Sequence, residues 1–307
     1  MLPSPRRPLY HWLDPLWSRF PFPVTASFEA GGFQGMRTFR MSRRFLGREI
    51  LPVWCYAVGD TLVDTGLPSL AGPIGDFARE SRIGRALLTH HHEDHSGNAA
   101  LLARRGVEIV AGPLAAPLLR LDLPARFYQH FLWGKAEPCA ATPALETVPI
   151  GRYEARVVHA PGHSVDQVAY FVAEEGWLFT GDAFLAEKVK VFRKDEDFAT
   201  TTDTVERFLR LDFDALLCAH RPRFEKGKES LRVKLQWMRE VEGLVRRWRS
   251  EGAEVREIVR RLGFSKATRN YWLTFGDVTA GNMVRSILHG PTPRPEVVEA
   301  LGGPHGR

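Results

Sequence analysis

The sequence predicts an α/β fold with a helical appendage at its C-terminal end. Short apolar runs with strand periodicity alternate with helical segments up to about residue 220, which is the pattern of layered α/β proteins. Several of these strands end in a histidine or an aspartate, at the position where α/β folds bind their ligands. Beyond Lys228 only helical spacing of apolar residues remains.

The elements can be taken in chain order. A hairpin is predicted near the start, because Gly59-Asp60 separates two apolar runs. The predicted strands are residues 51–58, 61–63, 85–89, 107–111, 155–159, 167–173, 176–180 and 215–219. The predicted helices between them are residues 68–80, 99–104, 202–211 and part of 114–141. Ser96 or Asn98 is expected to cap the helix at 99–104.

The chain is expected to divide into an N-terminal arm (1–24), a catalytic α/β domain (25–228) and a small C-terminal helical domain (229–307). The arm contains several prolines and no continuous apolar run, so we expect it to pack on the body rather than to act as a signal peptide. Apolar stripes predict the C-terminal helices at residues 231–248, 255–262 and 279–288.

Composition is typical of a globular protein from a reducing compartment. The three cysteines, Cys55, Cys139 and Cys218, do not suggest a disulfide framework, and no apolar run approaches the length of a membrane span. We therefore expect a cytoplasmic protein without membrane contact, and the sequence does not give its oligomeric state. The net charge of +6 is concentrated in residues 221–262, where 13 lysines and arginines accompany 7 glutamates. A solvated helical face is the expected interpretation, with attraction of an anionic partner as the alternative.

The densest chemical feature is the run Thr89-His90-His91-His92-Glu93-Asp94-His95. Imidazoles this close would repel one another if protonated, whereas a divalent cation keeps them neutral and uses their nitrogens as ligands. The run lies in a strand-to-helix loop, beyond the carboxyl end of the strand at 85–89. It therefore predicts a metal site.

Four more polar residues occupy the same kind of position, at the ends of other strands: Asp64, His163, Asp182 and His220. Single aspartates and histidines in turns are common, but five such strand ends in one chain predict a shared site. Imidazoles with a few carboxylates and no thiolate suit zinc, with iron or manganese as alternatives.

The pattern Thr89-His90-x-His92-x-Asp94-His95, followed by the later strand-end residues in this order, resembles the metallo-β-lactamase-fold hydrolase superfamily over residues 50–222. The resemblance implies a four-layer αβ/βα sandwich in which two mixed sheets face each other and a dinuclear metal site lies at one edge. It also implies a ligand set: His90, His92 and His163 for one ion, Asp94, His95 and His220 for the second, Asp182 as the bridge, and Asp64 as a hydrogen-bonding partner within the histidine loop.

Two metal ions in such a site would share a hydroxide and lower its pKa toward neutrality, with Asp94 as the catalytic residue that orients it or carries its proton. His91 and Glu93 alternate with the ligands, so we expect them to make loop contacts. The main dizinc β-lactamases have cysteine where this chain has Asp182, so the resemblance favours the glyoxalase-II-like, lactonase-like and ribonuclease-like branches.

The expected substrate is a small molecule with an ester-like bond, a thioester or a lactone. Lys188, Lys190, Arg193 and Lys194 could meet an anionic group on it. One alternative is a metal-dependent endoribonuclease or phosphodiesterase, motivated by the basic segment, and a second is a sulfur dioxygenase with one iron ion. For the aromatic segment 127–133, the sequence leaves both a core role and a role as a pocket lid open.

Overall fold

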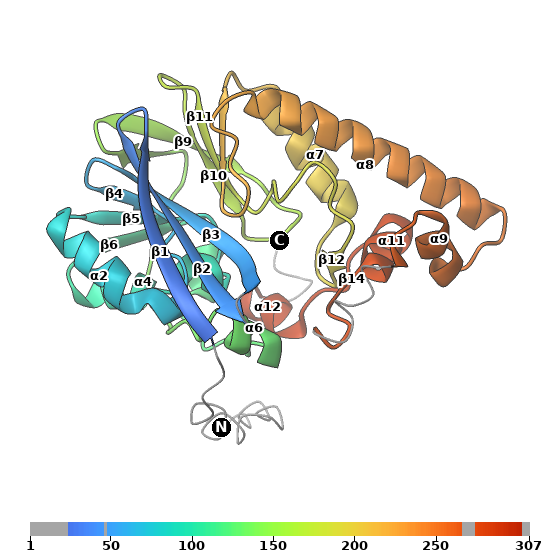
Figure 1. The fold of residues 1–307 in the computed structure, drawn as a ribbon, viewed down its shortest axis with the longest axis horizontal. Coiled ribbons are helices and arrows are strands. Elements are labelled where there is room, and N and C mark those ends of the chain that lie inside the picture. The colour runs from blue at the N-terminus through green and yellow to red at the C-terminus, as the bar shows by residue number, and fades with distance from the viewer. Residues whose placement is uncertain (1–23, 46–47, 266–273, 303–307) are drawn as a thin grey trace.

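A computed structural model describes residues 24–45, 48–265 and 274–302 of the chain. Two β-sheets face each other and helices cover their outer faces, which gives four layers (Figure 1). This confirms the predicted α/β sandwich with helices at its C-terminal end. The expected N-terminal arm, residues 1–24, lies outside the described residues except for Val24, so its packing stays a prediction.

The first sheet has seven strands in chain order, antiparallel from β1 to β4 and parallel from β4 to β7. They are β1 (Val24–Phe33), β2 (Met36–Phe45), β3 (Arg48–Val58), β4 (Thr61–Val63), β5 (Arg85–Leu88), β6 (Glu108–Ala111) and β7 (Thr142–Pro143). The β1–β2 hairpin is not among the predicted elements. Its turn residues, Gln34 and Gly35, have φ angles of 46° and 78°, which suit a two-residue hairpin turn.

The second sheet has five strands in the order β13-β11-β10-β9-β8, and only the β11–β13 pair is parallel. They are β8 (Thr147–Ile150), β9 (Tyr153–His159), β10 (Val168–Val172), β11 (Trp177–Gly181) and β13 (Ala215–Cys218). A small ribbon of β12 (Phe192–Arg193) and β14 (Val278–Thr279) joins the segment after β11 to the C-terminal helices.

The predicted helices occur in the predicted order, with shifts at their ends, whereas α3 and α12 are not among the predicted elements. The helices are η1 (Pro68–Leu70), α2 (Ala71–Glu80), α3 (Glu93–Ser96), α4 (Ala99–Arg104), α5 (Ala115–Leu118), α6 (Phe127–Leu132), α7 (Phe198–Leu209), α8 (Gly227–Ser250), α9 (Val255–Arg261), α11 (Ala280–His289) and α12 (Pro295–Ala300). Helix α7 begins four residues before the predicted start, because the Asp197 side chain accepts the Thr200 amide and caps it. Asn98 is the N-cap residue of α4, one of the two predicted, but its side chain makes no capping hydrogen bond and instead donates to the carbonyls of Thr65 and Leu67.

Alternation of side chains along the central strands separates the layers. In β10, Val168, Tyr170 and Val172 lie in the apolar layer between the sheets, whereas Ala169 and Phe171 lie on the outer face. Both faces are therefore buried, which explains why this strand reads as a continuous apolar run.

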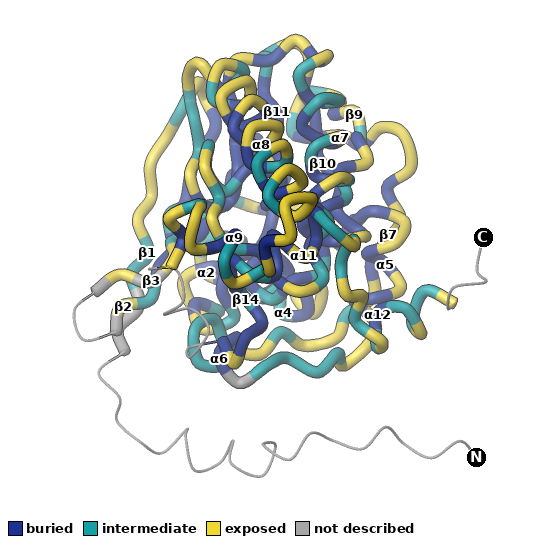
Figure 2. The backbone as a smooth tube through the Cα atoms, turned by 90° about the vertical axis from the view of Figure 1, so that its right-hand side faces the viewer, coloured by how far each residue is buried: buried dark blue, intermediate teal, exposed yellow. Residues whose placement is uncertain are grey.

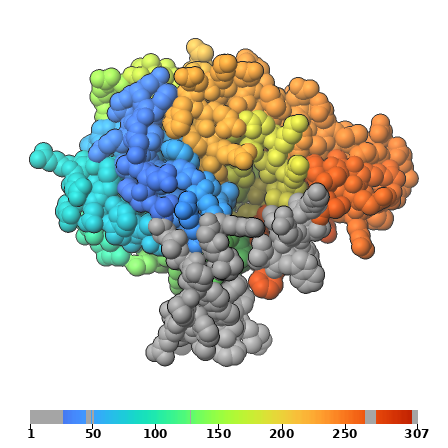
Figure 3. Space-filling model, in the orientation of Figure 1, coloured from blue at the N-terminus to red at the C-terminus, as the bar shows by residue number. Residues whose placement is uncertain are grey.

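Helix α8 belongs to two clusters. Leu231 and Leu235 in its first half pack on the outer face of the five-stranded sheet, and Met238 and Val245 pack with α9 and α11. Figure 2 shows its buried side against the body and its exposed side outward. In Figure 3 the blue hairpin β1–β2 and the orange C-terminal helices lie on the two flanks of one face. The domain boundary at residue 228 stays a prediction.

Within the described part of the chain, no helix combines the length and the apolar character needed to cross a lipid bilayer.

Candidate metal centre

The candidate ligands meet at one edge of the sandwich, where strands of both sheets end. They follow β5 in the first sheet and β9, β11 and β13 in the second. In the order of these four strands they are His90, His92, Asp94 and His95, then His163, then Asp182, then His220, and all seven side chains are buried. The expectation that these strand ends converge therefore matches the geometry.

The second half of the histidine run is helical, whereas the sequence predicts a loop. His92 has extended backbone angles (φ −60°, ψ 148°) and directly precedes α3. Its carbonyl accepts the amides of His95 and Ser96, and the Ser96 hydroxyl donates to the carbonyls of His91 and His92 at 2.9 and 3.1 Å. The backbone is therefore extended at His92 and helical from Glu93 onward. This change of conformation directs the side chains before and after Glu93 to different places.

The first ligand group consists of His90, His92 and His163. Nε2 of His90 lies 2.8 Å from Nδ1 of His92, and Nε2 of His163 lies 3.2 Å from the same atom. Burial lowers the pKa of His90 and of His92 well below its usual value, so these rings are neutral. Neutral imidazoles whose nitrogens converge are the form in which histidine binds a metal ion.

The second ligand group consists of Asp94, His95, Asp182 and His220, whose candidate ligand atoms all lie within 4.8 Å of one another. Oδ1 of Asp182 lies 3.3 Å from Nε2 of His95, and Oδ2 lies 3.2 Å from Nε2 of His220. Asp94 lies 3.8 and 3.7 Å from the same two nitrogens. Asp182 also reaches the first group, since its Oδ2 lies 3.4 Å from Nε2 of His163.

The electrostatics of the second group centre on Asp182. Burial raises the pKa of its carboxyl, but the charges of His220, His95 and His163 outweigh burial and hold that pKa well below its usual value. Burial lowers the pKa of the same histidines, and the carboxylates of Asp182 and Glu196 raise it above its usual value. The ionised carboxylate is thus stabilised by positive charge on the surrounding histidines, and a divalent cation at the same place would stabilise it in the same way.

Unpaired buried atoms point in the same direction. Nε2 of His95 and Oδ1 of Asp182, which lie 3.3 Å apart, form no hydrogen bond of acceptable geometry with any described residue. A buried polar atom without a partner costs about 1–3 kcal/mol, and metal ligation of His95 and Asp182 would remove that cost. Five imidazoles and two carboxylates without a thiolate form a donor set that fits a divalent metal ion.

The rings of the second group are oriented through their other nitrogens. Asp64, at φ 57°, accepts the Thr89 amide at 2.8 Å and lies 2.8 Å from Nδ1 of His95. Nδ1 of His220 donates to the Pro52 carbonyl at 2.7 Å. The Pro52 contact is not predictable from sequence, because it depends on how β3 and β13 face each other.

A cavity of about 790 Å³ opens on the ligands. Apart from ligands of both groups, its walls include Leu51 and two pairs of aromatic residues in contact, Trp54 with Phe224 and Tyr128 with Trp133. Tyr128 is only 5 % exposed. The aromatic segment therefore contributes both to the core and to the wall of this cavity.

Of the basic residues expected near the substrate, only Arg193 lines the cavity; Lys188, Lys190 and Lys194 are exposed elsewhere. Arg193 is buried and its Nε and Nη2 donate to the Asp195 carboxylate at 3.1 and 3.4 Å. Its Nη1 has no hydrogen bond to any residue that the structure describes.

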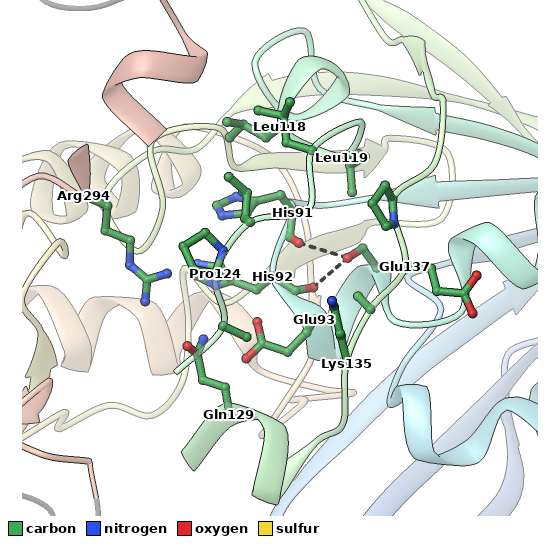
Figure 4. Close-up of a pocket in the computed structure, with 16 residues that line it drawn as sticks. His91, His92, Glu93, Leu118, Leu119, Pro124, Gln129, Lys135, Glu137 and Arg294 are labelled. Atoms are coloured by element: carbon green, nitrogen blue, oxygen red, sulfur yellow. Dashed lines mark hydrogen bonds between the residues drawn. The ribbon is translucent and has the colours of Figure 1, made fainter. Parts of the chain in front are cut away.

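A second, much smaller cavity of about 60 Å³ is lined by His91, His92 and Glu93 of the histidine run. Figure 4 shows Glu93 there with Gln129, and Arg294 reaching in from the C-terminal segment. Burial and the neighbouring Asp94 raise the pKa of the Glu93 carboxyl. The space suits water rather than a substrate.

The arrangement agrees with a family comparison. The model of the metallo-beta-lactamase superfamily matches residues 48–220, which include the two ligand groups. The chain belongs to the metallo-beta-lactamase superfamily. The superfamily fold implies divalent metal binding, and the His and Asp groups described above fit it.

Curated relatives within the superfamily match only part of their length. A hydroxyacylglutathione hydrolase of Halorhodospira halophila is 37% identical over 105 residues, 34% of this chain and 34% of the relative. An atrochrysone carboxyl ACP thioesterase of Cryptosporiopsis is 29% identical over 135 residues, 44% of this chain and 32% of the relative. The matched regions thus cover less than half of these relatives.

Solved structures support the superfamily fold. A metallo-beta-lactamase from Pontibacter korlensis has a TM-score of 0.51 at 17% identity and covers 69% of this chain and 99% of its own. The metallo-beta-lactamase FIM-1 from Pseudomonas aeruginosa has a TM-score of 0.52 at 20% identity and covers 72% and 97%. At this identity the likeness concerns the fold alone.

Proposed function

We propose that the protein is a dinuclear metal-dependent hydrolase that cleaves an ester-like bond, with a thioester as the first choice and a lactone as the alternative. The observation that carries this proposal is the position of Asp182. Its Oδ1 faces His95 of the second group, and its Oδ2 faces both His220 and His163, so one carboxylate contacts ligands of both groups. A carboxylate in this position could serve as a ligand to both of two neighbouring ions.

The proposed ligands follow the two groups: His90, His92 and His163 for the first ion, Asp94, His95 and His220 for the second, and Asp182 for both. When bound, two divalent ions supply a nucleophilic water at neutral pH and a positive charge that polarises the substrate. We propose zinc in both positions, with iron or manganese as the alternative outcome of metal analysis.

Asp94 is the proposed catalytic residue. It lines the large cavity, and its Oδ2 lies 3.7 Å from Nε2 of His220. A carboxylate in this place can orient the attacking water and accept its proton. Asp64 has a different role, since it contacts Thr89 and His95 within the histidine loop and does not line the cavity.

The cavity walls suggest the substrate class. Leu51, Trp54 and Phe224 give the cavity an apolar surface that suits an acyl chain or an apolar leaving group. Arg193 adds a buried guanidinium with a free nitrogen, which suits a carboxylate or phosphate elsewhere on the same substrate. A small anionic acyl ester is therefore the proposed partner. The names of the relatives, a hydroxyacylglutathione hydrolase and an ACP thioesterase, favour a thioester over a lactone.

The nuclease alternative was suggested by the positive charge of residues 221–262, and ion pairs account for part of that charge. On α8 and α9 several arginines pair with nearby acids, among them Arg246 with Glu242 at 2.8 Å and Arg261 with Glu257 at 2.6 Å. This arrangement favours a solvated helical face over a nucleic-acid surface. Nucleic acid is therefore kept as one of the substrates in the test below.

The test is a substrate panel with the full-length protein loaded separately with Zn²⁺, Mn²⁺ and Fe²⁺. The panel contains thioesters with and without a carboxylate, a lactone, a phosphodiester, single-stranded RNA and a cephalosporin. We expect metal-dependent thioester hydrolysis, faster for the carboxylate-bearing member, and a loss of about 10²- to 10⁴-fold in Asp94→Ala. Asp214→Asn is the matched control, because Asp214 is exposed and its side chain accepts the Lys226 amide, a hydrogen bond that the asparagine oxygen can still accept.

Other results would contradict the proposal in distinct ways. Hydrolysis that survives in Asp94→Ala would remove Asp94 from the mechanism. Cleavage of RNA or the phosphodiester without thioester hydrolysis would support the nuclease. One iron and no second ion per chain in metal analysis would replace the dinuclear site by the sulfur dioxygenase alternative.

A further inference from the structure

Asp166 connects the two loops that supply the first ligand group. The His163 loop is closed at its base, where the Ala160 amide donates to the Gln167 carbonyl at 2.9 Å. Asp166 lies within this loop, and its side chain is completely buried. Its carboxylate reaches across to the histidine run and receives two hydrogen bonds there.

Both of these hydrogen bonds come from His91. The His91 amide donates to Oδ2 of Asp166 at 2.8 Å, and Nδ1 of His91 lies 2.9 Å from Oδ1. The Ser164 hydroxyl donates to Oδ1 as well. Burial raises the pKa of the Asp166 carboxyl, but His91 and Ser164 outweigh burial and leave that pKa below its usual value. The carboxylate is therefore ionised and fully hydrogen-bonded.

His91 stands between two ligands of the first group, so fixing its backbone fixes theirs. Its amide belongs to the peptide bond that follows His90, and its carbonyl to the one that precedes His92. On the carbonyl side of this segment, the Ser96 hydroxyl donates to the carbonyls of His91 and His92 (dashed lines in Figure 4). Asp166 holds the opposite side, the amide and the ring.

We propose that Asp166 is a positioning residue for the first ligand group: through His91 it aligns the histidine run with the His163 loop. The first group depends on this alignment, because it combines His90 and His92 from one loop with His163 from the other, and the His163–His92 nitrogen distance is 3.2 Å. The second group takes no ligand from the His163 loop and has its own carboxylate partner, Asp64 on His95. Asp166 should therefore act on one ion only. This inference rests on the proposed dinuclear function.

The ring of His163 is held by other groups. Its Nδ1 lies 3.4 Å from Oε1 of Glu196, which also accepts the Arg193 amide at 3.1 Å. The Val168 amide donates to the Thr89 carbonyl at 2.8 Å and keeps the two loops adjacent. Removal of the Asp166 carboxylate should therefore leave the fold in place and shift His90 and His92 relative to His163, while Asp94 and His95 keep their places in the second group.

The experiment measures Zn²⁺ binding to metal-free full-length protein by competition with a chromophoric chelator, and Co²⁺ binding by visible absorption, in wild type and Asp166→Asn. The asparagine keeps the size of the side chain, but its NH₂ group cannot accept from His91. We expect one of the two Zn²⁺ affinities to fall about 10- to 100-fold, and the Co²⁺ absorption of a single site to disappear. The affinity of Asp166→Asn for the other Zn²⁺ ion should change less than threefold.

Two further variants distinguish positioning from general stabilisation. Ser164→Ala removes one hydrogen bond to Asp166 but keeps both from His91, so both affinities should stay near wild type. Asp64→Asn should weaken the binding of the ion held by the second ligand group, because Asp64 contacts His95. Thermal unfolding of the metal-free variants should differ little from wild type. If Asp166→Asn folds poorly, His91→Phe replaces it, because this variant keeps the amide hydrogen bond and loses only the ring contact.

The outcomes separate the inference from the proposed function. If wild type binds one ion, the dinuclear proposal fails, and the affinity for that ion in Asp166→Asn still decides the role of Asp166. If every affinity in Asp166→Asn stays within threefold of wild type, or if both ions weaken equally, the positioning role is overturned.

Discussion

At the scale of single residues, His95, His163 and His220 of the metal centre make contacts through both ring nitrogens. One nitrogen faces the other ligands, and the second meets Asp64 in the case of His95, the Pro52 carbonyl in the case of His220, and Glu196 in the case of His163. Such partners fix the ring orientation and raise its basicity as a ligand. The ligands could be predicted from their residue types and spacing. Most of their partners could not, because a glutamate or a proline carbonyl carries no such signal.

A buried lysine near this centre gives a prediction about pH. Lys234 on α8 is buried, and its Nζ donates only weakly to the Ala186 carbonyl at 3.4 Å. Burial lowers its pKa from 10.5 to about 8. Between these two values the unfolded chain holds a proton that the folded chain has lost, so stability rises with pH from about 8 to 10.5. Below about pH 8 the folded protein carries the full cost of the buried charge.

We therefore expect Lys234→Met to be more stable than wild type at pH 7, by up to about 3 kcal/mol, the free energy that corresponds to this pKa shift. The difference should shrink as pH rises from 8 to 10.5. Urea unfolding at several pH values measures it, and Lys188→Met, at an exposed lysine, is the control. A difference that does not vary with pH would contradict the burial of a charged lysine.

At the scale of elements, the ribbon β12–β14 links the cavity to the C-terminal helices. Its register pairs Phe192 with Thr279, which places Arg193 at the cavity and Thr279 at the start of α11. The sequence predicts α11 from its apolar stripe but gives no sign of the ribbon, since two-residue strands have no periodicity to detect. The same holds for α3, a single turn inside the ligand run.

Thr279 is expected to stabilise α11 as its N-cap. Its Oγ1 accepts the Asn282 amide at 3.0 Å. Thr279→Val keeps the shape of the side chain and loses this hydrogen bond, so the free energy of unfolding should fall by about 1 kcal/mol. Thr279→Ser loses a methyl group and keeps the hydroxyl, so it should retain most of the stabilisation that the capping hydrogen bond provides. Chemical denaturation compares the two. Equal losses in both variants would mean that packing, not capping, determines the effect.

At the scale of the whole molecule, the metal centre joins the two sheets. Four candidate ligands follow β5 in the seven-stranded sheet, and the other three follow strands of the five-stranded sheet. An ion bound there would contact only the folded arrangement, because the unfolded chain separates these residues widely. Binding should therefore stabilise the whole sandwich.

We expect removal of metal by a chelator to lower the melting temperature by several degrees and re-addition of Zn²⁺ to restore it. One ion at a hundred times its Kd contributes about 2.7 kcal/mol. Scanning calorimetry of dialysed protein measures this shift. Asp182→Ala should lose most of the response, since Asp182 contacts both groups, whereas Asp214→Asn should keep it. If neither the chelator nor Zn²⁺ changes the melting temperature, metal binding at this site is contradicted.

The sequence by itself determined the fold class, most of the strands and helices, and the chemical nature of the site. These follow from local patterns: apolar periodicity along each strand, and histidines and aspartates at strand ends. Only the tertiary structure decided that Asp166 holds His91, and that Arg193 rather than the neighbouring lysines lines the cavity. The reason is physical. These contacts join residues far apart in the chain, and their geometry depends on sheet register and on how the two sheets face each other, which no local pattern encodes.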